Sequence, residues 1–241
     1  MQKIKLFCIP YAGGSAVIYS NWKSSLAPWI ELRPVELAGR GRRIHDPLYN
    51  SIEEAAQDVF KSIESEAGNC PYVLFGHSMG CMIAYELARK IRAERFPPPL
   101  HLFFSGRRAP HVTAGKEKKL HLLNDQEFKE EILQLGGTPP EFFEHRELQE
   151  LFLPLLRQDF KLTETHIFDG KLPPLDTDIT VLAGKEDDLT PEECDGWKHH
   201  TSKICTIHYF NGGHFFFQKE VARITKIIGN TIQNLEIPIA V

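Results

Sequence analysis

The stretch that most constrains the fold of this chain runs from Tyr72 to Gly80, with the sequence Tyr-Val-Leu-Phe-Gly-His-Ser-Met-Gly. Its first four residues are apolar, which is typical of a short buried strand. After Ser78 the apolar residues change to helical spacing, at Met82, Ile83, Leu87 and Ile91. The sequence therefore predicts a strand that turns sharply into a helix at Ser78.

Ser78 lies inside a Gly-x-Ser-x-Gly pentapeptide that begins at Gly76 and ends at Gly80. In a strand–turn–helix context this pattern is typical of a nucleophile elbow, which projects the serine hydroxyl beyond the sheet. The strand end and the helix start nearly touch in such an elbow, so side chains at both glycine positions are excluded. We interpret Ser78 as a nucleophile, the alternative being a chance match in a tight turn.

A serine hydroxyl needs a base to accept its proton, and that base needs an orienting carboxylate. In sheets of this kind the chain order is serine, acid, histidine. His214 follows the predicted last strand, residues 203–210, and two glycines. Asp187 and Asp188 both follow the strand 179–183, and Asp187 is favoured as the third residue after Gly184.

The oxyanion formed during acyl transfer requires preorganised hydrogen-bond donors. The backbone N–H of Met79, directly after the nucleophile, is one predicted donor. The other is expected from Tyr11 or Ala12, in the small-residue loop 11–15 after the first strand.

Predicted strands alternate with helices along the chain, which indicates an α/β fold with a mostly parallel twisted sheet and helices on both faces. We expect one domain, residues 1–241. The expected strands are 4–9, 31–37, 72–75, 100–105, 178–183 and 203–210, and the expected helices outside the insertion include 16–27, 51–66 and 221–235.

About seventy residues separate the fourth and fifth of these strands, where one crossover helix would suffice. Helical patterns cover 125–135 and 147–160, with a kink expected at Pro154. We interpret residues 107–175 approximately as a helical lid insertion over the carboxyl ends of the strands. The alternative is two extra helices packed on the core.

The composition argues against several other classes of protein. The chain has 241 residues and a net charge of −4, which gives no nucleic-acid signature. No apolar run is long enough to span a membrane, and no signal peptide is visible at the start. The five scattered cysteines indicate free thiols in a reducing compartment and no metal site, so we expect a cytoplasmic protein.

Beyond the elbow, four further segments resemble the type II thioesterases, the stand-alone editing enzymes of nonribosomal peptide and polyketide synthesis. The segments are Cys-Ile-Pro-Tyr-Ala-Gly-Gly-Ser-Ala, Glu-Leu-Ala-Gly-Arg-Gly-Arg-Arg, Leu-Gly-Gly-Thr-Pro-Pro and Gly-Gly-His-Phe-Phe. The family usually has proline where Ala38 stands here, and often has proline at the position of Asp188.

The resemblance implies an α/β-hydrolase with a Ser-His-Asp triad. Such an enzyme clears acyl, aminoacyl or peptidyl groups from the phosphopantetheine arm of carrier protein domains. No metal or free cofactor is implied, because the phosphopantetheine belongs to the substrate. A monomer is the default expectation. The alternatives are a medium-chain acyl-carrier-protein thioesterase of fatty-acid synthesis, a general serine carboxylesterase, and a non-catalytic carrier-binding module.

Other basic residues and histidines have weaker patterns. Arg40, Arg42 and Arg43 form a basic loop that could contact a carrier or a phosphate, the alternative being a solvated loop. We interpret His77 as a packing residue, and expect the pair at 199–200 and His145 to be solvated.

Overall fold

The computed structural model describes residues 3–112, 118–138, 142–143 and 145–235. One sheet organises it, with six parallel strands in the order β2-β1-β3-β4-β5-β6. The strands are β1 (Ile4–Ile9), β2 (Ile30–Pro34), β3 (Tyr72–His77), β4 (Leu102–Ser105), β5 (Ile179–Gly184) and β6 (Cys205–Phe210). The α/β class and the parallel sheet are confirmed, and β2, which ends at Pro34, lies at an edge of the sheet, where a residue without an N–H is tolerated.

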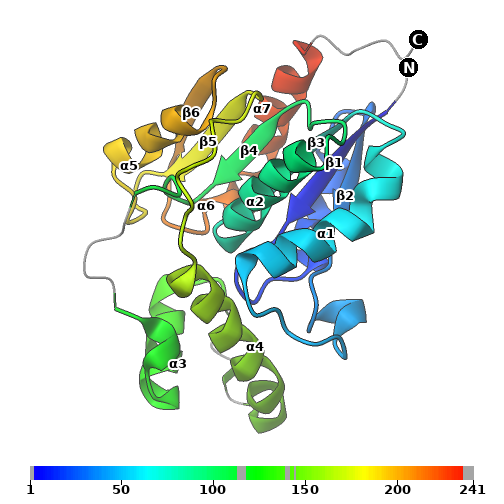
Figure 1. Cartoon of the computed structure of the whole chain (residues 1–241). Helices are drawn as coiled ribbons and strands as arrows, with labels where there is room; N and C mark the ends of the chain where they lie inside the picture. Colours follow the sequence, from blue (N-terminus) through cyan, green and yellow to red (C-terminus); the bar gives the residue numbers. More distant parts are fainter. Residues whose placement is uncertain (1–2, 113–117, 139–141, 144, 236–241) are drawn as a thin grey trace.

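Helices cover both faces of the sheet (Figure 1). The α-helices are α1 (Ile52–Ala67), α2 (Met79–Ala93), α3 (Asp125–Leu135), α4 (Arg146–Thr165), α5 (Pro191–Asp195), α6 (Phe216–Lys219) and α7 (Val221–Gln233). Short 3-10 helices are η1 (Ala16–Ser24), η2 (Gly41–Arg43), η3 (Leu120–Leu122) and η5 (Gly196–His200). None of the helices in the described ranges is long and apolar enough to cross a membrane.

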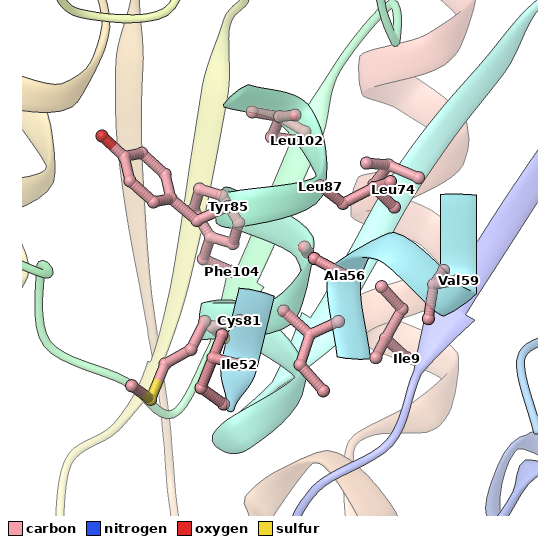
Figure 2. Packing of buried hydrophobic residues seen from close by; sticks show 14 of the residues in the cluster. Ile9, Ile52, Ala56, Val59, Leu74, Cys81, Tyr85, Leu87, Leu102 and Phe104 are labelled. Atoms are coloured by element: carbon pink, nitrogen blue, oxygen red, sulfur yellow. The ribbon is translucent and has the colours of Figure 1, made fainter. Parts of the chain in front are cut away.

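The α1 and α2 helices pack on one face of the sheet. Figure 2 shows buried side chains of this layer, among them Ile52, Ala56 and Val59 of α1, which belong to one core cluster with Leu74 of the central strand β3. The hydroxyl of Ser51 caps α1 by accepting the N–H of Glu54, which fixes where the helix begins. Because β3 is covered on both faces, all six of its residues are buried, as a central parallel strand requires.

The opposite face is covered by η1 and α7. Tyr19 and Trp22 of η1 are fully buried against Phe75 of β3, and α7 contributes an apolar stripe at Ile224, Ile228 and Ile232. The helix expected over 16–27 is instead a 3-10 helix that ends at Ser24. The segment 191–200, for which no helix was expected, forms α5 and η5, and α5 begins with a capping box from Thr190 and Glu193.

Two helices of the insertion lie beyond the carboxyl ends of the strands (Figure 1). The α3 bounds agree with the expected helix, whereas α4 is longer than expected and continues as one helix through Pro154. The two helices share a small core of Phe128, Ile132 and Leu156. The expected insertion also includes 113–117, 139–141 and 144, which lie outside the described residues, as do the two prolines of the Leu-Gly-Gly-Thr-Pro-Pro segment.

Candidate active site

The turn at Ser78 has the geometry that the elbow motif predicts. Ser78 has φ 53° and ψ −115°, in the left-handed region that non-glycine residues rarely adopt. A Cβ placed on Gly76 would lie 2.2 Å from the carbonyl oxygen of Gly80, and one on Gly80 would lie 2.2 Å from that of Ile9. Because backbone occupies both positions, the strand-to-helix turn requires glycine there, and the predicted elbow is confirmed.

The loops after β5 and β6 are joined by backbone contacts. The N–H of Lys185 donates to the carbonyl of Phe210 at 2.8 Å, and that of Glu186 to the carbonyl of Gly212 at 3.2 Å. A Cβ on Gly184 would lie 2.4 Å from the Gly212 oxygen, so the loops approach this closely only with glycine. These contacts bring the residues that follow β5 close to His214.

Asp187 is the carboxylate that faces His214. The Nδ1 atom of His214 lies 3.2 Å and 3.1 Å from the two carboxylate oxygens of Asp187. Asp188 instead donates its backbone N–H to the Asp187 carboxylate at 2.9 Å. The geometry therefore places Asp187, and not Asp188, in the position that orients an imidazole.

His77 lies directly behind His214, with 5.1 Å between the ring centroids. Its Nδ1 is 2.9 Å from the hydroxyl oxygen of Ser105, and its ring packs on Phe217 at 4.1 Å. Burial holds the pKa of His77 well below its usual value, so its ring stays neutral in this position. The packing position that we inferred for His77 is confirmed.

The loop after β1 approaches the start of α2. A Cβ on Gly80 would also lie 2.9 Å from the carbonyl oxygen of Pro10, which shows how closely the loop passes. Tyr11 and Ala12 line the same cavity as Ser78, while Met79 is the first residue of α2. Tyr11 and Ala12 therefore border the same cavity as the serine, and Met79 adjoins Ser78 in the chain.

A cavity of about 560 Å³ contains Ser78, Asp187 and His214 in its wall. The insertion contributes apolar side chains to this wall, among them Leu120, Ile132, Leu135, Leu156 and Phe160. A Cβ on Gly137 would lie 2.3 Å from the ring of Phe215, which adjoins His214, so the segment after α3 packs directly beside the imidazole. The insertion thus forms one side of the site.

Two of the three expectations about the basic residues of the loop 40–43 require correction. Arg40 does not belong to a solvated loop, because its side chain is 3% exposed and forms an ion pair with Asp159 at 2.8 Å. It cannot present its guanidinium to a carrier. Arg43 is bound to Asp58 and Asp46, both at 2.6 Å, and these bonds limit its reach toward a partner. Of the three, only Arg42 is exposed.

His200 was expected to be solvated and is buried instead. Its Nδ1 lies 2.8 Å from the hydroxyl of Tyr85, and its Nε2 lies 2.7 Å from Nδ1 of His111. Burial lowers the pKa of His200 to about 4. His199 and His145 are exposed, as expected.

Asp159 was missed by the sequence analysis. It is 2% exposed and lies on the buried face of α4 with Leu155, Leu156 and Leu162. A carboxylate at helical spacing within an apolar stripe was the available signal, because a buried charge requires a partner. That partner is Arg40.

These features define the α/β-hydrolase fold. They are a parallel sheet, an elbow after its central strand β3, and an acid and a histidine after β5 and β6. The described residues contain no group of three or more His, Cys, Asp or Glu side chains arranged to hold a metal ion. A family model described as a thioesterase domain matches residues 4–233. The chain therefore belongs to the thioesterase family, and it is a hydrolase of the serine α/β-hydrolase type.

Individual relatives agree with this assignment. The chain is similar to ClbQ from the colibactin NRPS/PKS pathway, with TM-score 0.91, 38% identity, and coverage of 98% of this chain and 99% of that one. It is also similar to YbtT, a type II thioesterase of the yersiniabactin NRPS/PKS pathway (TM-score 0.86, 32% identity, coverage 95% and 92%). A rat (Rattus norvegicus) relative, the medium-chain S-acyl fatty acid synthase thioesterase, is 32% identical, with coverage of 89% and 82%.

Proposed function

We propose that this thioesterase hydrolyses acyl, aminoacyl or peptidyl thioesters carried on the phosphopantetheine arm of carrier proteins in a nonribosomal peptide or polyketide synthetase. The observation that supports this best is the placement of Ser78 and the Asp187–His214 pair in one cavity walled by the apolar insertion helices. The similarity to ClbQ and YbtT, which belong to such pathways, supports the choice of carrier.

In the proposed mechanism the hydroxyl of Ser78 attacks the thioester carbonyl carbon while His214 accepts its proton. Asp187, bound to Nδ1, keeps the other ring nitrogen of His214 available and stabilises the imidazolium. The carbonyl oxygen becomes an oxyanion bound by backbone N–H groups of Met79 and of Ala12 or Tyr11. The intermediate collapses, the C–S bond breaks, and an acyl-enzyme remains.

The leaving thiol requires little assistance, because a thiol pKa of about 8.5 makes the thiolate a good leaving group. The His214 imidazolium gives its proton to the departing thiolate, which leaves as the free thiol. Neutral His214 then takes a proton from water as the water attacks the carbonyl carbon of the acyl-enzyme, and it returns that proton to the Ser78 oxygen as the free acid is released. In this mechanism no metal or free cofactor takes part, since the phosphopantetheine arm is part of the substrate. We further propose that the protein works as a cytoplasmic monomer.

The rat relative favours one alternative, a medium-chain acyl-carrier-protein thioesterase of fatty-acid synthesis. It would use the same residues and differ in the acyl group and carrier. A general carboxylesterase is less well supported, because the chain belongs to the thioesterase family. The two alternatives separate in one assay, because only the first requires a carrier.

The test is mass spectrometry of a panel of loaded carrier proteins before and after treatment with the protein. The panel contains peptidyl and acyl carriers of a synthetase and a fatty-acid acyl carrier protein, each loaded with short, medium and aminoacyl groups. Aryl esters are assayed in parallel, and Ser78→Ala is the control. We expect rapid unloading of the synthetase carriers by the wild type only. Preference for medium-chain fatty-acid carriers, or for free esters, would refute the proposal.

A further inference from the structure

The ion pair between Arg40 and Asp159 joins the insertion helix α4 to the loop that follows β2. Arg40 follows β2 and Asp159 lies in α4, and both side chains are almost completely buried. The pair is bidentate, with Nη1 to Oδ2 at 2.8 Å and Nη2 to Oδ1 at 3.0 Å. Such a geometry fixes both side chains in orientation as well as in charge.

The same two side chains hold the loop after β1. The Oδ2 atom of Asp159 accepts the backbone N–H of Gly13 at 2.7 Å, and Nη1 of Arg40 donates to the carbonyl of Gly14 at 3.1 Å. Gly13 has φ +78°, and a Cβ there would lie 2.6 Å from Cδ1 of Leu156 in α4. The loop is therefore fixed by hydrogen bonds and by direct contact with the helix.

The loop geometry transmits this constraint to Tyr11 and Ala12. The N–H of Gly14 donates to the carbonyl of Tyr11 at 2.9 Å, which closes a tight turn over these residues. Gly13 and Gly14 therefore cannot shift without moving Ala12. An oxyanion donor is effective only while its N–H keeps its distance to the developing charge.

From these contacts we propose that Asp159, oriented by Arg40, is a positioning residue for the backbone donors of the loop 11–14. This inference rests on the proposed function, in which that loop stabilises the oxyanion formed at Ser78. Asp159 touches neither the substrate nor the reacting atoms. Its effect is to anchor the loop to the insertion helix α4, so that the helix and the backbone donors keep a fixed relative position.

The decisive test compares single substitutions with a double substitution. Asp159→Leu and Arg40→Met each leave one buried charge unpaired and should lower both Tm and kcat. Arg40→Met combined with Asp159→Leu removes both charges, and such replacements usually preserve stability. Because Gly13 and Gly14 still lose their partners, we expect the double variant to recover Tm while its kcat for a small acyl thioester stays about 10- to 100-fold low. A double variant with wild-type Tm and wild-type kcat would overturn the proposal.

A second measurement tests the proposal even if the double variant does not fold. Asp159→Asn keeps the shape of the side chain but removes its charge, and so weakens its hydrogen bonds to Arg40 and Gly13. A trifluoromethyl ketone probes the oxyanion directly: the Ser78 oxygen adds to its carbonyl carbon, the serine proton passes to His214, and the ketone oxygen becomes the alkoxide. We expect Asp159→Asn to weaken this inhibitor about tenfold or more, while a thioether analogue that lacks the carbonyl binds as to wild type. Equal loss for both inhibitors, or none for either, would refute the positioning role.

Arg157→Met is the matched control. Arg157 is also in α4, but it binds the carbonyls of His121 and Leu123 and the carboxylate of Asp125, and so joins the insertion to itself. We expect this variant to bind the trifluoromethyl ketone like wild type. A loss equal to that of Asp159→Asn would show that general loosening of the insertion is responsible, and would overturn the proposal. These inhibitors need no carrier, so an outcome here is distinct from failure of the carrier assay.

Discussion

Ser78 adopts a backbone conformation that costs energy and that its surroundings maintain. A non-glycine residue at φ 53° persists only where the neighbouring structure determines it, and here β3 and α2 do so from either side. This conformation places the hydroxyl at the start of α2, where the first backbone N–H groups of the helix have no partner within the helix. The strain at this residue is thus connected with the proposed chemistry.

Asp187 and Asp188 differ in what they contact, which allows a matched test. Asp187→Asn should lower kcat for an acyl thioester by about 10³- to 10⁴-fold, because an amide cannot hold the His214 tautomer that accepts the serine proton. Asp188→Asn should have little effect, since only its backbone N–H contacts Asp187. Steady-state kinetics on one small thioester compares the two variants. Equal losses would contradict the assignment of Asp187.

At the scale of elements, the elbow and the insertion are built differently. The elbow is local, since its strand, turn and helix are consecutive in the sequence and Gly76 meets Gly80 four residues away. The insertion is held from outside its own segment, by Arg40, by the loop at Gly13 and by Phe215. Its position over the site therefore depends on residues distributed through the whole chain.

Two glycines in helices test the elbow packing. Gly80→Ala should destabilise the protein by about 2–4 kcal/mol, because the new methyl group would overlap the backbone of Ile9. Gly229→Ala in α7 is the control, since the nearest atom to its Cβ, in Ala27, is 4.0 Å away. There we expect a gain of up to about 1 kcal/mol from helix propensity. Urea denaturation measures both, and a tolerated Gly80→Ala would disprove the close approach.

At the scale of the whole molecule, buried neutral histidines make stability depend on pH. His101, directly before β4, is buried, its Nε2 lies 2.8 Å from the hydroxyl of Thr180, and burial lowers its pKa to about 4. In the unfolded chain a histidine pKa is about 6.5, so the unfolded state binds more protons between these values. The contribution of His101 to stability is complete above about pH 6.5 and decreases as the pH falls toward 4.

The His101→Gln variant tests this dependence. The free energy of unfolding of the wild type should fall by up to about 3 kcal/mol between pH 6.5 and pH 4 on account of this group. The variant should show a smaller fall over the same interval, although other groups contribute to both proteins. Urea denaturation at several pH values measures the two slopes. Parallel slopes would indicate that His101 titrates normally in the folded protein.

Most of the fold and of the candidate site could be predicted because their signals are local. A buried strand followed by helical spacing marks the elbow at Ser78, and glycines mark the loops before Asp187 and His214. The 3-10 form of Ala16–Ser24 and the helix at Pro191–Asp195 were missed, because short helices lack a full apolar period.

The sequence by itself determined the six strands, the elbow and the residues of the proposed triad, since their signals are short runs and turns set by neighbouring residues. The alternation of strands and helices also indicated the parallel sheet. Only the tertiary structure decided which charged groups are buried. Arg40 and Asp159 are separated by 119 positions and His111 and His200 by 89, and neither pair has a local pattern. A charge or an imidazole leaves water only where the fold supplies its partner, so its environment is a property of the assembled molecule.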